Sequence, residues 1–89
     1  MIQYKITLSR YKDGQLRLST PQWVVAVNFD DAVLRANMIL IGARGIDPDA
    51  DFAIHAVEQY GSHGTQCDGV LLFETAEEFS ARLQAKKDA

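Results

Sequence analysis

Few residues in this chain have side chains that could bind a metal or serve as a nucleophile and its base: His55, His63, Cys67 and Asp68. His63 and Cys67 lie four positions apart in a glycine-containing stretch, so both could reach one zinc ion, with His55 or Asp68 as third ligand. The chain has no C-x-x-C or H-E-x-x-H motif. A thiolate at Cys67 activated by His63 is less favoured, because a glycine-rich loop fixes neither side chain. Our main expectation is that the chain binds no metal or other cofactor. A metal site at His55, His63 and Cys67 is kept as an alternative hypothesis.

Cations in the first part of the chain are the second group of candidate binding residues: Lys5, Arg10, Lys12 and Arg17. With neighbouring tyrosines they could form a basic and aromatic surface for nucleic acid. The whole chain, however, has a net charge of −3, whereas nucleic-acid affinity usually depends on a basic surface. We therefore do not expect nucleic acid as the partner, and this basic hairpin remains an alternative.

Length and composition define the class of protein that must position these residues. The 89 residues predict one domain spanning residues 1–89, and 47% hydrophobic with 24% charged residues is typical of a soluble globular domain. No apolar run approaches the roughly 20 residues that span a bilayer, and no signal peptide is visible, so we expect no membrane partner. A single cysteine excludes an internal disulfide and favours a cytoplasmic setting.

The stretch from Asn28 to Ile46 predicts the central helix. Asn28 is a suitable N-cap, and Asp31 three positions later gives a capping-box-like arrangement. Gly45 is predicted as the left-handed residue that ends the helix. Apolar residues at steps of four and three form one stripe, which we expect to face the core: Phe29, Val33, Ala36, Leu40 and Ala43.

Two strands precede this helix. Apolar residues alternate from Ile2 to Leu8 and again at Leu16 and Leu18, with Lys12-Asp13-Gly14 between the two runs. Cross-strand partners share a face, so we expect a three-residue loop that pairs Leu8 with Leu18 rather than a two-residue Asp-Gly turn.

After Pro21 the apolar alternation changes phase, from even to odd positions. A bulge at Pro21 would turn Trp23, Val25 and Val27 into the core, and this is the interpretation we favour. In the alternative there is no bulge, and these three residues form an apolar patch on the far face that requires a cover, most simply a second copy of the chain.

The second half repeats the order of elements. Residues 51–60 alternate as a strand, which we favour over a helix from Pro48 to Tyr60. Val70 to Phe73 predicts a short buried strand, and Thr75 with Glu78 forms a capping box that begins the last helix. The chain is therefore predicted to be α+β, in the order β-β-α-β-β-α, with a four-stranded, mainly antiparallel sheet and both helices packed on one face.

No stretch specifies a chemistry convincingly. The leading hypothesis is a small non-enzymatic protein-protein interaction or regulatory module that acts as a homo-oligomer, most simply a dimer, with Trp23, Val25 and Val27 at its interface. The alternatives are a metal- or ligand-binding domain or enzyme that uses the region of His55, His63 and Cys67, and a nucleic-acid accessory protein that uses the basic hairpin.

Overall fold

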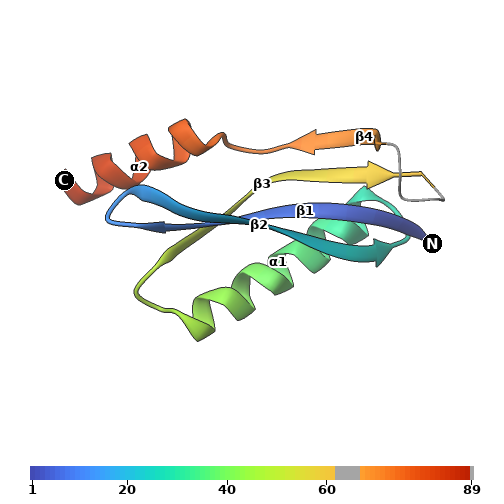
Figure 1. Ribbon diagram of the computed structural model, residues 1–89, viewed down its shortest axis with the longest axis horizontal. Coiled ribbons are helices and arrows are strands. Elements are labelled where there is room, and N and C mark those ends of the chain that lie inside the picture. Colours follow the sequence, from blue (N-terminus) through green and yellow to red (C-terminus); the bar gives the residue numbers. More distant parts are fainter. Residues whose placement is uncertain (62–66, 89) are drawn as a thin grey trace.

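The computed structural model describes residues 1–61 and 67–88 and confirms the α+β class (Figure 1). Its four strands form one sheet in the order β2-β1-β3-β4, and every neighbouring pair of strands is antiparallel. Residues 51–60 form a strand, as favoured from their alternation. The elements are β1 (Ile2–Lys12), β2 (Gln15–Ala26), α1 (Phe29–Ile46), β3 (Asp51–Tyr60), β4 (Cys67–Leu72) and α2 (Ala76–Asp88).

The start of α1 matches the prediction, and its end does not. The side chain of Asn28 accepts a hydrogen bond from the backbone N–H of Asp31 at 2.9 Å, and the Asp31 carboxylate accepts one from Val27 at 3.0 Å. At the other end, Gly45 stays within the helix, which continues to Ile46 and is followed by Asp47 as C-cap with an extended φ. The predicted left-handed stop at Gly45 is therefore wrong, because Asp47 donates its backbone N–H to Ala43 and satisfies that carbonyl.

The β1–β2 hairpin has the two-residue turn that we did not expect. Asp13 and Gly14 both have positive φ, and Lys12 pairs with Gln15 across them. The register then shifts, because Arg17 is an extra residue in β2, and Arg10 pairs with Leu18. Even-numbered residues of β1 therefore stand opposite even-numbered residues of β2, as we predicted, but a bulge in β2 causes this match and not a three-residue loop.

The bulge predicted at Pro21 is absent, and the alternative holds. Pro21 pairs with Thr7 in a continuous edge strand, so Val24 and Ala26 face the core while Trp23 and Val25 point to the other face. Proline is tolerated there because an edge strand needs hydrogen-bond donors on one side only.

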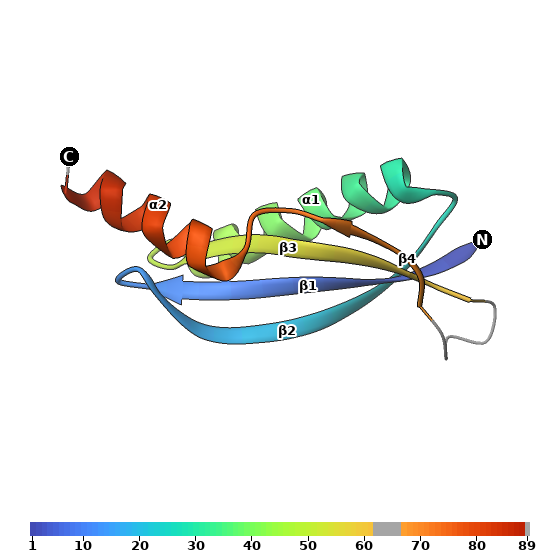
Figure 2. The same cartoon turned by 90° about the horizontal axis from the view of Figure 1, so that it is seen from above.

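Helix α1 covers one face of the sheet along its length (Figure 2). Its Ala32 and Ala36 pack on Tyr4, Ile6 and Val57 in the main core. Small residues on the helix allow the large side chains of the strands to approach it closely.

Helix α2 packs on the opposite face, at the hairpin end of the sheet (Figure 1). Arg10 pairs with Asp47 just after α1, whereas the next residue of β1, Tyr11, contacts Phe79 of α2. Because successive side chains of a strand point to opposite faces, the two helices lie on different faces at this end. The expectation that both helices share one face is therefore wrong in this detail, since α1 already occupies the first face and the stripe of α2 covers Tyr11 and Ala53.

Strand β4 differs from its prediction in length and burial. It begins at Cys67 rather than Val70, and it forms the second edge of the sheet. Apolar residues that we expected to be buried are instead exposed, because this edge has no covering element among the described residues: Val70, Leu71, Leu72 and Phe73.

Candidate functional site

The half of the sheet away from the hairpin has one face that no helix covers among the described residues. Trp23 and Val25 of β2 lie on it, each 49% exposed. The register places Val70 and Leu72 of β4 on the same face, because they stand across from Glu58 and Ala56 of β3. We call the surface formed by Trp23, Val25, Tyr60, Val70 and Leu72, with Lys5 and Glu58 at its centre, the open sheet face.

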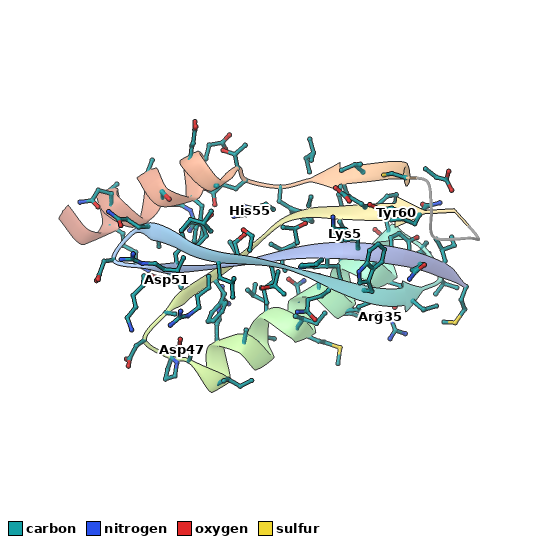
Figure 3. All side chains as sticks on the ribbon, in the orientation of Figure 1. Lys5, Arg35, Asp47, Asp51, His55 and Tyr60 are labelled. Carbon is teal, nitrogen blue, oxygen red and sulfur yellow. The ribbon has the colours of Figure 1, made fainter. Side chains whose placement is uncertain are left out.

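Charged and aromatic groups meet in the middle of the open sheet face. Lys5 Nζ lies 4.0 Å from the Glu58 carboxylate, and the rings of Trp23 and Tyr60 touch edge to face with centroids 5.0 Å apart. Figure 3 labels Lys5 and Tyr60 in this half of the sheet, away from His55. Partial burial raises the pKa of Tyr60, and the hydrogen bond from its hydroxyl to Glu58 raises it further. The surface is therefore apolar at both edges with a neutralised ion pair between them.

Val27 lies next to the open sheet face rather than within it. It follows the last residue of β2 in the turn into α1 and is 63% exposed. Its side chain is therefore available, but the sheet does not fix its position as it does for Trp23 and Val25.

The cations of the hairpin are divided between the two faces. Lys5 is paired with Glu58 on the open sheet face, and Arg10 is paired with Asp47 on the face of α1, at 2.7 Å. Lys12 and Arg17 lie at the tip of the hairpin, where both are exposed. The four residues do not form one basic surface, so the fold lends no support to the nucleic-acid alternative.

His55 has a structural position between β3 and α2. It is the extra residue of a bulge in β3, and its Nδ1 bonds to the backbone carbonyl of Glu74. Because a carbonyl only accepts, Nδ1 carries the proton, and in the neutral ring Nε2 then accepts from the Tyr11 hydroxyl at 2.6 Å. Burial raises the pKa of Tyr11, with a further contribution from Glu74. Both ring nitrogens of His55 are thus engaged in holding α2 on the sheet.

Cys67 of the metal-site hypothesis is not assembled with His55 into a group of metal ligands among the described residues. Cys67 is exposed at the start of β4, where its thiol contacts the carbonyl of Gly69. Within residues 1–61 and 67–88, no three His, Cys, Asp or Glu side chains converge as metal ligands. His63 lies outside the described residues.

A second apolar surface was not anticipated from the sequence. Leu34, Met38 and Ile41 project from the side of α1 that faces away from the sheet, and they are 60%, 65% and 67% exposed. We call these three residues the outer stripe. Their spacing of four and three positions is visible in the sequence. It was overlooked because the apolar stripe from Phe29 to Ala43 already explained α1 as a helix with one buried side.

Comparisons with family models, with curated proteins and with solved structures gave no match. Neither helix of the described chain combines the length and apolar character that crossing a membrane would require.

Proposed function

We propose that this chain is a non-enzymatic interaction module that self-associates, with the open sheet face as its contact surface. The observation that supports it most directly is the position of Trp23 and Val25, two large apolar residues held half-exposed on a regular sheet face that no described helix covers. Large aromatic residues are enriched at the centres of protein interfaces and rare on surfaces that contact only water.

The composition of the open sheet face also suits a second copy of the chain. It presents both a cation, Lys5, and an anion, Glu58, between apolar edges. A surface that contains both signs can satisfy both when it packs on itself, whereas a surface of one sign would repel its copy. The cytoplasmic location expected from the lone cysteine is part of the proposal.

The test uses Trp23, which is the only tryptophan of the chain. Light scattering and tryptophan emission are recorded on the full chain from about 1 µM to about 500 µM, a range that detects micromolar association. We expect the mass to double at least and the emission maximum to move to shorter wavelength over the same range, because self-association removes Trp23 from water.

Two results would contradict the proposal. One is a monomer at every concentration, and the other is association during which the emission of Trp23 does not change. Trp23→Glu should abolish the association, and Leu18→Glu is its matched control, because Leu18 is a large exposed residue of the same strand but lies at the hairpin end, outside the open sheet face.

A further inference from the structure

Helix α1 carries apolar side chains on two opposite sides. Ala32 and Ala36 are buried against the sheet, while the outer stripe of Leu34, Met38 and Ile41 is exposed on the other side. A helix on the surface of a globular protein normally has a polar outer side, and one that is apolar all round is normally buried. The outer stripe therefore has no cover among the described residues.

The spacing of the stripe is that of a helix-helix seam. Steps of four and three residues, from 34 to 38 to 41, place the side chains on one line along the helix, as in an antiparallel or parallel coiled coil. The next seam position is Gly45, and a methyl group built on Gly42 or Gly45 would meet no atom within 4 Å outside the helix itself in the described structure. The C-terminal half of the stripe is thus open to the close approach of another helix.

We propose that the outer stripe packs against the outer stripe of a second copy, as an antiparallel helix pair with its two-fold axis close to Met38. This inference shares with the proposed function only the identity of the partner. The outer stripe and the open sheet face lie on opposite sides of the molecule, so either contact can form without the other.

The charges that flank the stripe are complementary in an antiparallel pair. Asp30, Asn37 and Arg44 are seven positions apart and lie along one flank of the seam. Asp30 and Arg44 are exposed, and neither forms an ion pair within the described residues. In an antiparallel pair these flanks face each other, so Asp30 of each copy lies close to Arg44 of the other and the two charges are of opposite sign.

The dimensions of α1 set the expected strength. Its 18 residues form a helix about 27 Å long, so a single pair of such helices buries an area at the low end of specific interfaces. We therefore expect association in the micromolar range rather than an obligate dimer. If both surfaces are used, two different two-fold contacts join dimers into tetramers or longer assemblies.

The experiment compares substitutions at the two surfaces by sedimentation velocity on the full chain, from about 5 µM to about 500 µM. Met38→Glu places a charge at the centre of the seam, and we expect it to raise the dissociation constant of the helix pair at least about tenfold. Leu18→Glu is the control for adding a carboxylate to an exposed apolar position, and we expect it to leave the dissociation constant unchanged. Circular dichroism confirms that each variant is folded.

The pattern of results separates this inference from the proposed function. If Met38→Glu weakens association, the helix pair is supported. If, in addition, the emission of Trp23 does not change while the wild-type chain associates, the open sheet face is contradicted. If Met38→Glu has no effect, or the wild-type chain stays monomeric, the helix pair is overturned. An association abolished by Trp23→Glu and unaffected by Met38→Glu supports the open sheet face alone.

Disulfide trapping tests the orientation in a Cys67→Ser background, which removes the one native thiol. Met38→Cys lies near the proposed axis, and we expect it to form a disulfide with its own copy under mild oxidation. Leu34→Cys should do so only when mixed with Ile41→Cys, since these positions face each other in an antiparallel pair. Efficient self-linking of Leu34→Cys would mean a parallel pair and would overturn the arrangement.

Discussion

Two tyrosines on β1 provide a matched test of how hydrogen bonding stabilises this fold. Tyr4 and Tyr11 are both completely buried, and a change to phenylalanine removes only the hydroxyl of each. The Tyr4 hydroxyl has no hydrogen-bond partner among the described residues. The Tyr11 hydroxyl, by contrast, donates to Nε2 of His55 at 2.6 Å. The same chemical change should therefore have opposite effects at the two positions.

The magnitudes follow from what each hydroxyl leaves behind. Tyr11→Phe removes a hydrogen bond and leaves Nε2 of His55 unsatisfied in a partly buried site, which should lower the free energy of unfolding by about 1–3 kcal/mol. Tyr4→Phe removes a polar group that is buried without a partner, so unfolding should become harder by about 1 kcal/mol. We expect the free energies of unfolding of the two variants to differ by about 2 kcal/mol or more.

Urea unfolding followed by circular dichroism measures both changes, at one low protein concentration so that self-association contributes equally. Tyr60→Phe serves as control, because the Tyr60 hydroxyl is only partly buried and bonds to Glu58 at 3.2 Å, and its effect should stay within about 0.5 kcal/mol. The reasoning is refuted if Tyr4→Phe destabilises the protein as much as Tyr11→Phe does.

Three further predictions concern the attachment of α2, the cap of α1 and the tyrosines. Phe79→Ala should cost about 3 kcal/mol and raise hydrogen exchange in α2 first, since Phe79 is the buried residue of α2 that contacts Tyr11; equal exchange in all elements would contradict this. Asn28→Ala should lower stability by about 1 kcal/mol in thermal unfolding, whereas Asn37→Ala, a control within the same helix, should not. All three tyrosines have a pKa above the usual value, raised mainly by burial, so the folded protein keeps protons that the unfolded chain loses near pH 10. The contribution of the tyrosines to the free energy of unfolding should therefore be fully present below that pH and be lost as the pH rises above it. Absorbance at 295 nm should show less tyrosinate in the folded than in the urea-unfolded protein at pH 10–11.

The elements that the sequence predicted well are those specified by neighbouring residues. Asn28 and Asp31 form the cap of α1 through contacts three positions apart, and Thr75 bonds to the backbone of Glu78 at the start of α2 in the same way. The strand character of residues 51–60 followed from alternation alone. Such features depend on local geometry, so the sequence carries the whole signal.

Two errors were local, the helix end predicted at Gly45 and the length of the β1–β2 turn, and the others concern relations between distant residues. The extra residue Arg17 in β2 changes which side chains share a face, and alternation within one strand cannot locate it. The candidate contact surface was identified only as one of two alternatives, because the face on which Trp23 lies depends on whether Pro21 interrupts β2. The outer stripe of α1 was missed, because one buried side was enough to explain a helix.

The order of strands and helices along the chain, the N-terminal caps of both helices, and the chemistry available on each element were determined by the sequence alone, since each depends on residues within about one turn or one strand of each other. The tertiary structure decided which face α2 covers and which apolar residues remain exposed. The physical reason is competition for a limited apolar area: α1 occupies one face of the sheet, α2 takes Tyr11 and Ala53 on the other, and the surface around Trp23 is left without a cover among the described residues.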